Sequence, residues 1–86
     1  MTKREKLLVA IRANTKAVRF EDACKVAERL GFTHKGGQGS HCAFGRLDES
    51  DLLNFQNRSG YIPPYQARQL IRMMDKYGGE NDEVSD

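Results

Sequence analysis

The spacing of apolar residues changes at Gly31, and this change most constrains what the chain can fold into. Before Gly31, apolar residues recur every three to four positions, the period of an amphipathic helix. These residues are Phe20, Ala23, Ala27 and Leu30. After Gly31, apolar and polar residues alternate, as they do in a strand with one buried face. Because glycine often follows the last turn of a helix, the sequence predicts a helix over residues 20–30 and strands beyond it.

Three short strands are predicted after that helix, over residues 32–35, 40–46 and 51–56. The first two are joined by a turn made of Gly36, Gly37, Gln38 and Gly39, and a loop over residues 47–50 leads to the third. Alternation assigns one set of side chains to the side that packs on helices: Phe32, Phe44, Leu53 and Phe55. It assigns another set to the outer side: His41, Asn54 and Gln56.

Helices are also predicted at both ends of the chain. Residues 3–14 carry Leu7, Leu8 and Ile11 on one side, and residues 64–77 begin at a proline and end at Gly78 and Gly79. The order is then α-α-β-β-β-α. This order predicts an α+β fold, a three-stranded antiparallel sheet with helices packed on one face, like that of double-stranded-RNA-binding domains.

The charge of the chain is unevenly distributed. The net charge is +2, but the tail over residues 80–86 holds four acidic side chains and no basic one. The rest carries 14 basic and 8 acidic side chains, a net charge of +6. Such an excess attracts a polyanion, of which nucleic acid is the commonest. The alternative is that the basic residues only keep a small domain soluble.

Other features narrow the class of protein. No apolar run approaches the ~18–20 residues that span a bilayer, so we expect a cytoplasmic protein that does not bind membranes. Cys24 and Cys42 match no zinc-ligand spacing with His34 and His41, and we interpret them as reduced thiols in the core. No glycine-rich loop has nucleotide-binding spacing. We therefore predict neither a cofactor nor a metal.

A short motif in the second predicted strand resembles the signature of a known family. Gly39, Ser40 and His41, followed by Phe44, are similar to the GSH-x-x-F motif of HicA toxins. The resemblance continues through VRFEDACKVAERLGF, LNFQ and PYQARQLIRMMDKYG, and covers residues 18–78. It leaves an N-terminal helix and connector at 1–17 and an acidic tail, predicted to be disordered, at 79–86. The chain departs from the family at Cys42, where members often carry a second histidine, and it lacks their later histidine near a proline.

The resemblance implies a function and a set of partners. HicA proteins are toxins of type II toxin–antitoxin systems, metal-independent endoribonucleases that cut messenger RNA. The implied partner is a HicB-type antitoxin that covers the face carrying His41. Operator DNA would be bound only through the complex with the antitoxin.

The chemistry of RNA cleavage suits a lone histidine. RNA supplies its own nucleophile, the 2′-hydroxyl, and an imidazole gives or accepts protons near neutral pH. We expect His41 to act as acid or base, with Lys35 or Arg46 stabilising the developing charge. Gly39 either closes the hairpin or lets a phosphate approach the backbone, and Ser40 either helps to hold that phosphate or is structural. Because one histidine cannot easily be both acid and base in the same step, we expect a modest rate.

Other candidate contacts lie outside the motif. Arg68, Arg72 and Lys76 are spaced four apart and form a basic ridge. This ridge is a solvated helix face, a phosphate-binding surface or a contact for an acidic antitoxin. Tyr61 and Tyr65 could stack on bases, although Tyr65 could instead pack at the start of the helix. His34 is predicted to face inward or to lie at a sheet edge.

Two other functions remain open on the sequence. The first is a non-catalytic module that grasps structured RNA, with His41 incidental. The second is a pure interaction subunit whose basic ridge binds only proteins. Toxicity and transcript cleavage that depend on His41 would separate the enzyme from both.

Overall fold

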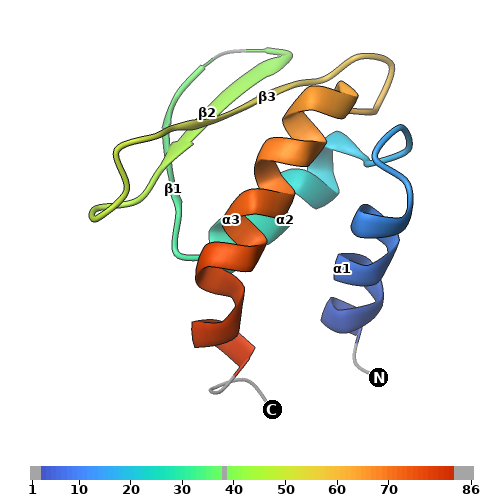
Figure 1. The fold of residues 1–86 in the computed structure, drawn as a ribbon. Coiled ribbons are helices and arrows are strands. Elements are labelled where there is room, and N and C mark those ends of the chain that lie inside the picture. The colour runs from blue at the N-terminus through green and yellow to red at the C-terminus, as the bar shows by residue number, and fades with distance from the viewer. Residues whose placement is uncertain (1–2, 38, 83–86) are drawn as a thin grey trace.

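A computed structural model describes residues 3–37 and 39–82, without the side chains of residues 3, 4 and 79–82. It contains three helices and three strands in the predicted order (Figure 1). In chain order these are α1 (Lys3–Ala13), α2 (Phe20–Arg29), β1 (Thr33–Gly36), β2 (His41–Gly45), β3 (Leu53–Gln56) and α3 (Pro64–Asp82). The predicted α+β class, with helices packed against an antiparallel sheet, is confirmed.

Helix α2 ends as its sequence predicts. Gly31 adopts a positive φ of 91° directly after the helix. The N–H of Phe32 donates to the carbonyl oxygen of Ala27 at 3.0 Å, and that of Gly31 donates to Glu28 at 3.1 Å. This pair of bonds is the Schellman motif, which satisfies the last carbonyl groups of a helix. It turns the chain from α2 directly into β1.

The sheet has the strand order β1-β2-β3, with both pairs antiparallel. In the β2–β3 pair, His41 lies opposite Gln56 and Phe44 lies opposite Leu53. The β1–β2 pair contains a bulge between His34 and Gly36. The strands are shorter than predicted at several ends, and Gln38 of the predicted hairpin turn lies outside the described residues.

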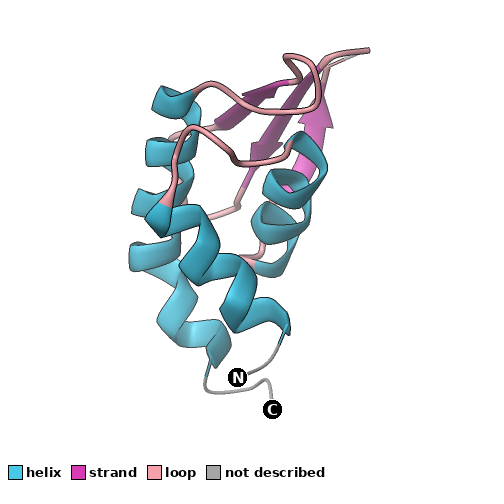
Figure 2. Ribbon diagram, turned by 90° about the vertical axis from the view of Figure 1, so that its right-hand side faces the viewer, coloured by secondary structure: helices cyan, strands magenta, loops and turns pink. Residues whose placement is uncertain are grey.

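The core lies between the sheet and the helices (Figure 2). The four apolar side chains predicted to face inward are each at most 2% exposed: Phe32, Phe44, Leu53 and Phe55. Burying one such side chain stabilises a fold by roughly 1.5–3 kcal/mol. This packing fixes which face of each strand points outward, and therefore where the candidate site lies.

Helix α3 covers the free edge of β3. The side-chain oxygen of Gln66 accepts from the N–H of Gln56 at 2.8 Å, and the side-chain amide of Gln69 donates to the carbonyl oxygen of Leu52 at 3.1 Å. These bonds satisfy backbone groups that an edge strand would otherwise expose. Gln66 is itself buried, at 6% exposed.

Helix α1 packs into the same core from the side of α3 (Figure 1). Ile11 is 2% exposed, while Leu7 and Leu8 pack partly buried against the core, as their spacing predicts. Arg12 of α1 forms an ion pair with Asp75 of α3 at 2.6 Å. The first helix therefore contributes to the stability of the domain.

The predicted end of the last helix is wrong. Helix α3 continues through Gly78 and Gly79 to Asp82. Glycine costs only about 1 kcal/mol relative to alanine in a helix, so two glycines do not by themselves stop one. The predicted disordered tail therefore includes helical residues 79–82, and residues 83–86 lie outside the described part. Within the described residues, no helix combines the length and apolarity that a membrane span requires.

Candidate active site

The GSH motif places His41 on the outer side of the sheet, as predicted. His41 is exposed at the start of β2, whereas the next residue is half-buried and Phe44 is fully buried. Ser40 Oγ lies 3.4 Å from His41 Nδ1. This contact engages Nδ1, one of the two ring nitrogens of His41.

Gln56 is the cross-strand neighbour of His41. Side chains of directly opposite residues lie on the same face, with Cβ atoms about 5 Å apart. Gln56 Oε1 accepts a hydrogen bond from Arg58 Nη2 at 3.1 Å. A guanidinium group therefore lies next to the neighbour of His41. Sequence reasoning missed Arg58 because it placed this residue in a loop, although its spacing of two from Gln56 was a usable signal.

Asn57 ties the GSH motif to the turn that follows β3. Its N–H donates to the carbonyl oxygen of Ser40 at 2.7 Å, just beyond the last pair of the β2–β3 ladder, His41 and Gln56. Its side-chain oxygen accepts from the N–H of Gly60 at 2.7 Å. Ser59 and Gly60 have φ values of 53° and 94°. Positive φ at both central positions is the pattern of a type I′ turn, which matches the twist of paired strands.

The turn over residues 58–61 is held on two sides. Arg58 and Tyr61 exchange backbone hydrogen bonds of 2.8 and 3.1 Å across the turn. The carbonyl oxygen of Gly60 accepts from Phe20, at the start of α2, and the N–H of Ile62 donates to Val18, both at 2.9 Å. The backbone of Arg58 is therefore fixed relative to α2 as well as to β2.

A pocket of about 240 Å³ adjoins this turn, with Asn57 on its wall. The other lining residues are Arg19, Phe20, Glu21 and Gly60. Arg19 is exposed and forms a backbone bridge with Tyr61. Arg19 thus lines a pocket whose wall includes Asn57, the residue that bonds to Ser40.

Gly37, which precedes the GSH motif, and Gly39, its first residue, have different surroundings. Gly37 has a φ of 104°, and a Cβ there would overlap the backbone of His41 and lie 2.9 Å from Cα of Cys42. Gly39 has a φ of 62°, but a Cβ there would meet nothing within 4 Å. Both of the roles considered for Gly39 are therefore compatible with its position, since its backbone needs glycine and open space surrounds it.

The structure does not bring Lys35 to His41, contrary to the expected pairing. The bulge in β1 lies at this residue, and the Lys35 side chain runs across Gly45, within about 3.1–3.2 Å of where a Cβ would stand. Gly45 is four residues from His41, or about 13 Å along the strand. Lys35 faces outward, but at the opposite end of β2.

Arg46 is also not positioned to act with His41, because it is engaged on the helix side. Its Nε donates to Asp48 at 2.8 Å, its Nη1 donates to the carbonyl oxygen of Leu30, and its guanidinium lies 4.0 Å from the centre of the Tyr77 ring. Its side chain is only 19% exposed. Arg46 therefore links β2, α2 and α3, and the expected role in stabilising charge at His41 is not supported.

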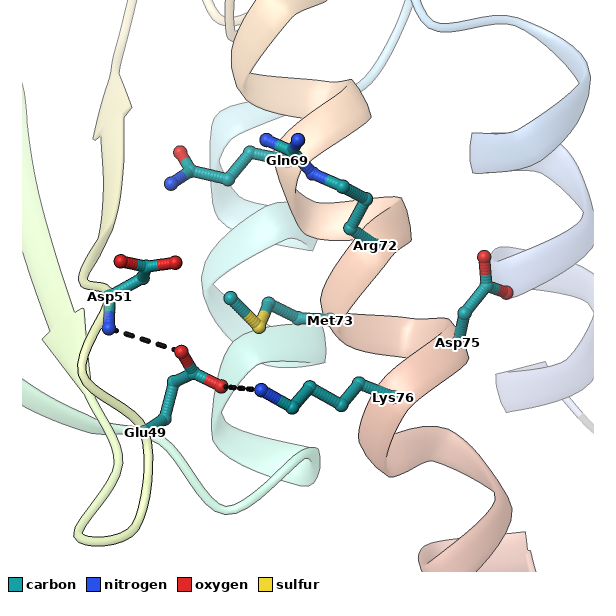
Figure 3. Close-up of a pocket in the computed structure, with 7 residues that line it drawn as sticks. All are labelled: Glu49, Asp51, Gln69, Arg72, Met73, Asp75 and Lys76. Atoms are coloured by element: carbon teal, nitrogen blue, oxygen red, sulfur yellow. Dashed lines mark hydrogen bonds and ion pairs between the residues drawn. The ribbon is translucent and has the colours of Figure 1, made fainter.

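The predicted basic ridge lies partly beside a second pocket, of about 390 Å³ (Figure 3). Arg72 and Lys76 line it from α3, and Glu49 and Asp51 line it from the loop between β2 and β3. Arg68 is exposed on the same helix. The residues of this pocket do not overlap with those around His41, so the ridge and the histidine form separate surfaces.

Lys76 is ion-paired within that pocket. Its Nζ lies 2.6 Å from Glu49 Oε1, and the hydroxyl of Tyr77 donates to the same oxygen at 2.5 Å. Glu49 is only 3% exposed. The Lys76 and Tyr77 bonds lower the pKa of Glu49 to about 2, and Glu49 in turn raises the pKa of both partners. Lys76 thus stabilises the fold, and its charge is largely neutralised.

The remaining candidates occupy mixed environments. Cys24 and Cys42 are free, half-buried thiols, and burial followed by the neighbouring Cys42 raises the pKa of Cys24 to about 12. His34 is exposed and lies on the face opposite to His41. The centre of its ring is 5.6 Å from that of Phe44, and the two rings are nearly perpendicular. Tyr65 is 57% exposed and therefore is not packed at the start of α3. Tyr61 is 40% exposed.

Comparison with known proteins gives one weak likeness. The chain is 37% identical over 62 residues to an arginine–tRNA ligase of Pseudomonas syringae pv. tomato. The match covers 66% of this chain and 11% of that protein, so the chain spans about a tenth of its relative's length. No family model matches the chain. No solved structure matches it either.

Proposed function

We propose that this chain is a cytoplasmic endoribonuclease that cleaves messenger RNA, the toxin of a HicA-type toxin–antitoxin pair. The observation that carries the proposal is the exposed imidazole of His41 in the GSH motif, with the Ser40 hydroxyl at Nδ1. The resemblance of residues 18–78 to HicA toxins supplies the activity and the partners. The arginine–tRNA ligase to which the chain is similar acts on an RNA, as its name says, and this supports RNA as the proposed ligand class.

The proposed reaction moves two protons. The 2′-hydroxyl loses its proton and attacks the adjacent phosphorus, and the bond from phosphorus to the 5′-oxygen breaks. The departing 5′-oxygen takes up a proton, so the products are a 2′,3′-cyclic phosphate and a 5′-hydroxyl. His41 performs one of these transfers and water performs the other. Among the described neighbours of His41, Ser40, Gln56 and Asn57 do not titrate near neutral pH, which agrees with a slow enzyme.

The proposed partner is a HicB-type antitoxin that covers the His41 face of the sheet. The outer face carries exposed His41 and Asn54 and, beyond β3, exposed Arg58. An acidic partner segment laid across it would block access to the histidine. Contact with operator DNA would be made by the antitoxin.

The test is a comparison of wild type with His41→Ala. We expect wild type to arrest growth when expressed from a tightly controlled promoter and to degrade transcripts, and His41→Ala to be harmless although equally folded. Purified wild type should cleave RNA in the presence of EDTA. A harmless wild type, or an equally toxic alanine variant, would refute the nuclease proposal.

The second candidate is a non-catalytic RNA-binding module on the same face. The absence of a second proton-transfer group among the described residues that contact or pair with His41 favours it over a fast enzyme. It predicts that RNA binds equally well to His41→Ala and is recovered intact. Intact transcripts after prolonged incubation with wild type would select this function.

A further inference from the structure

Arg58 is a cationic side chain that the structure brings to the residue opposite His41. The two residues predicted to stabilise charge at His41, Lys35 and Arg46, lie at the other end of β2 or are engaged on the helix side. Arg58 instead donates to the side chain of Gln56, the cross-strand partner of His41. Its position relative to His41 therefore follows from the strand register.

The register places His41 and Arg58 at a distance suited to one phosphate. Arg58 follows Gln56 by two residues and bonds to its side chain, so it takes the position of a diagonal neighbour of His41 on the same face. Such neighbours lie about 7–8 Å apart between backbones, and long side chains reach across that gap. A phosphate group bound between them could contact both the imidazole and the guanidinium.

The backbone at Gly39 is open to solvent. Gly39 is exposed, and a Cβ there would meet no atom within 4 Å. Glycine at this position leaves the GSH backbone accessible to a bulky anion.

Hydrogen bonds of both its backbone and its side chain fix the position of Arg58. Its N–H and carbonyl group bond to Tyr61 across the turn, and the turn is bonded to the chain entering α2. Ser59, the next residue, has a φ of 53°, a conformation that only glycine, asparagine and aspartate adopt readily. The type I′ turn requires this conformation, and the bonds across the turn hold Ser59 in it.

We propose that Arg58 contacts the scissile phosphate and stabilises the charge that develops on it during cleavage, with Gln56 as the positioning residue. This inference rests on the proposed nuclease function. The guanidinium offers paired N–H donors that match two phosphate oxygens. It adds the charge stabilisation that a lone histidine cannot provide.

The experiment measures single-turnover cleavage of a short RNA by wild type, Arg58→Ala and Arg58→Lys, with Arg29→Ala as matched control. Arg29 is an exposed arginine on α2, so its loss changes the net charge equally. We expect Arg58→Ala to lower the maximal rate about 10²-fold, with a smaller change in the RNA concentration at half-maximal rate. Arg58→Lys should recover part of the rate, and Arg29→Ala should cleave like wild type.

The outcomes separate this assignment from the proposed function. If wild type shows no cleavage that depends on His41, both the nuclease proposal and the assignment of Arg58 are refuted. If wild type and Arg58→Ala cleave at equal maximal rates, only the assignment of Arg58 falls. It also falls if Arg58→Ala weakens only the binding of an uncleavable 2′-O-methyl RNA. Should Arg58→Ala unfold, Arg58→Lys decides, because a purely structural hydrogen bond to Gln56 is kept by lysine and the rate would not change.

Discussion

Asn57 donates its backbone N–H to the carbonyl oxygen of Ser40 at 2.7 Å and thereby joins the GSH motif to the turn that carries Arg58. The side chain of Asn57 secures the other side of this connection, because its oxygen accepts from Gly60. His41 and Arg58 come from segments 17 positions apart, yet these bonds hold both at one corner of the sheet. The candidate site is therefore a property of the β2–β3 ladder and of the turn beyond it.

Replacing Asn57 with alanine should loosen this corner. The substitution removes one hydrogen bond and should lower the free energy of unfolding by about 1 kcal/mol, and it should also reduce RNA cleavage. Asn14→Ala is the matched control, since its side-chain oxygen accepts a similar local bond from Lys16 at 3.0 Å, at the end of α1. Equal cleavage by the two variants in a gel assay would show that the turn does not position the site.

The hairpin before His41 should tolerate substitution at one glycine and not at its neighbour. Gly37→Ala places a Cβ against the backbone of His41 and Cys42 at a positive φ, so we expect reduced stability and loss of cleavage. At Gly36 a Cβ meets nothing within 4 Å and φ is not positive, so Gly36→Ala should fold and cleave like wild type. Thermal unfolding and cleavage rates measured side by side test this difference.

The sequence was sufficient to predict the helices, the strands and the side of the sheet on which His41 lies, because each follows from the spacing of apolar residues. The end of α3 was missed, since a glycine pair only weakens a helix and nothing beyond it forces a stop. The strand ends were also misjudged, as they depend on pairing with neighbours and not on residue type.

The cationic side chain next to His41 could not be predicted in the same way. The sequence pointed to Lys35 and Arg46 because they are near His41 in the chain. In the structure, a bulge in β1 displaces Lys35. Arg46 instead contacts the ring of Tyr77 and the carbonyl oxygen of Leu30 at the end of α2. Arg58 depends on the β2–β3 register, which pairs His41 with Gln56. That register depends on the geometry of the loop between the two strands as well as on their apolar pattern, and the sequence alone does not give the loop geometry.

Ser59→Asn should stabilise the protein. Ser59 adopts a φ of 53°, and asparagine tolerates this region better than serine because its short side chain bonds locally. We expect the free energy of unfolding to rise by up to about 1 kcal/mol, with cleavage unchanged or slightly improved. Ser59→Val is the opposing variant, since a β-branched residue is poorly accommodated at positive φ. Denaturant titration of both variants is the measurement, and a loss of stability in Ser59→Asn would contradict the expected geometry.

Glu49 should make stability depend on acidic pH. Its pKa is lowered from 4.5 to about 2 in the folded state, chiefly by the hydrogen bond from Lys76 and then by that from Tyr77. A carboxyl group with a lowered folded-state pKa stabilises the fold fully above its ordinary value, and this contribution is lost as the pH falls from about 4.5 towards 2. Glu49→Gln should therefore be less stable than wild type at pH 7, and the difference should shrink between pH 4.5 and pH 2.

The control for this effect is a neighbour that does not titrate. Gln69 lines the same pocket and bonds to Leu52, so Gln69→Ala removes a hydrogen bond without removing a charge. Its difference in unfolding free energy from wild type should stay the same at pH 7 and pH 3, whereas that of Glu49→Gln should not. Lys76→Met should reproduce part of the Glu49→Gln behaviour, because it removes the cation that holds the carboxylate ionised. Urea titrations at both pH values measure all three variants, and a constant difference for Glu49→Gln would show that the Glu49–Lys76–Tyr77 group does not couple folding to protonation.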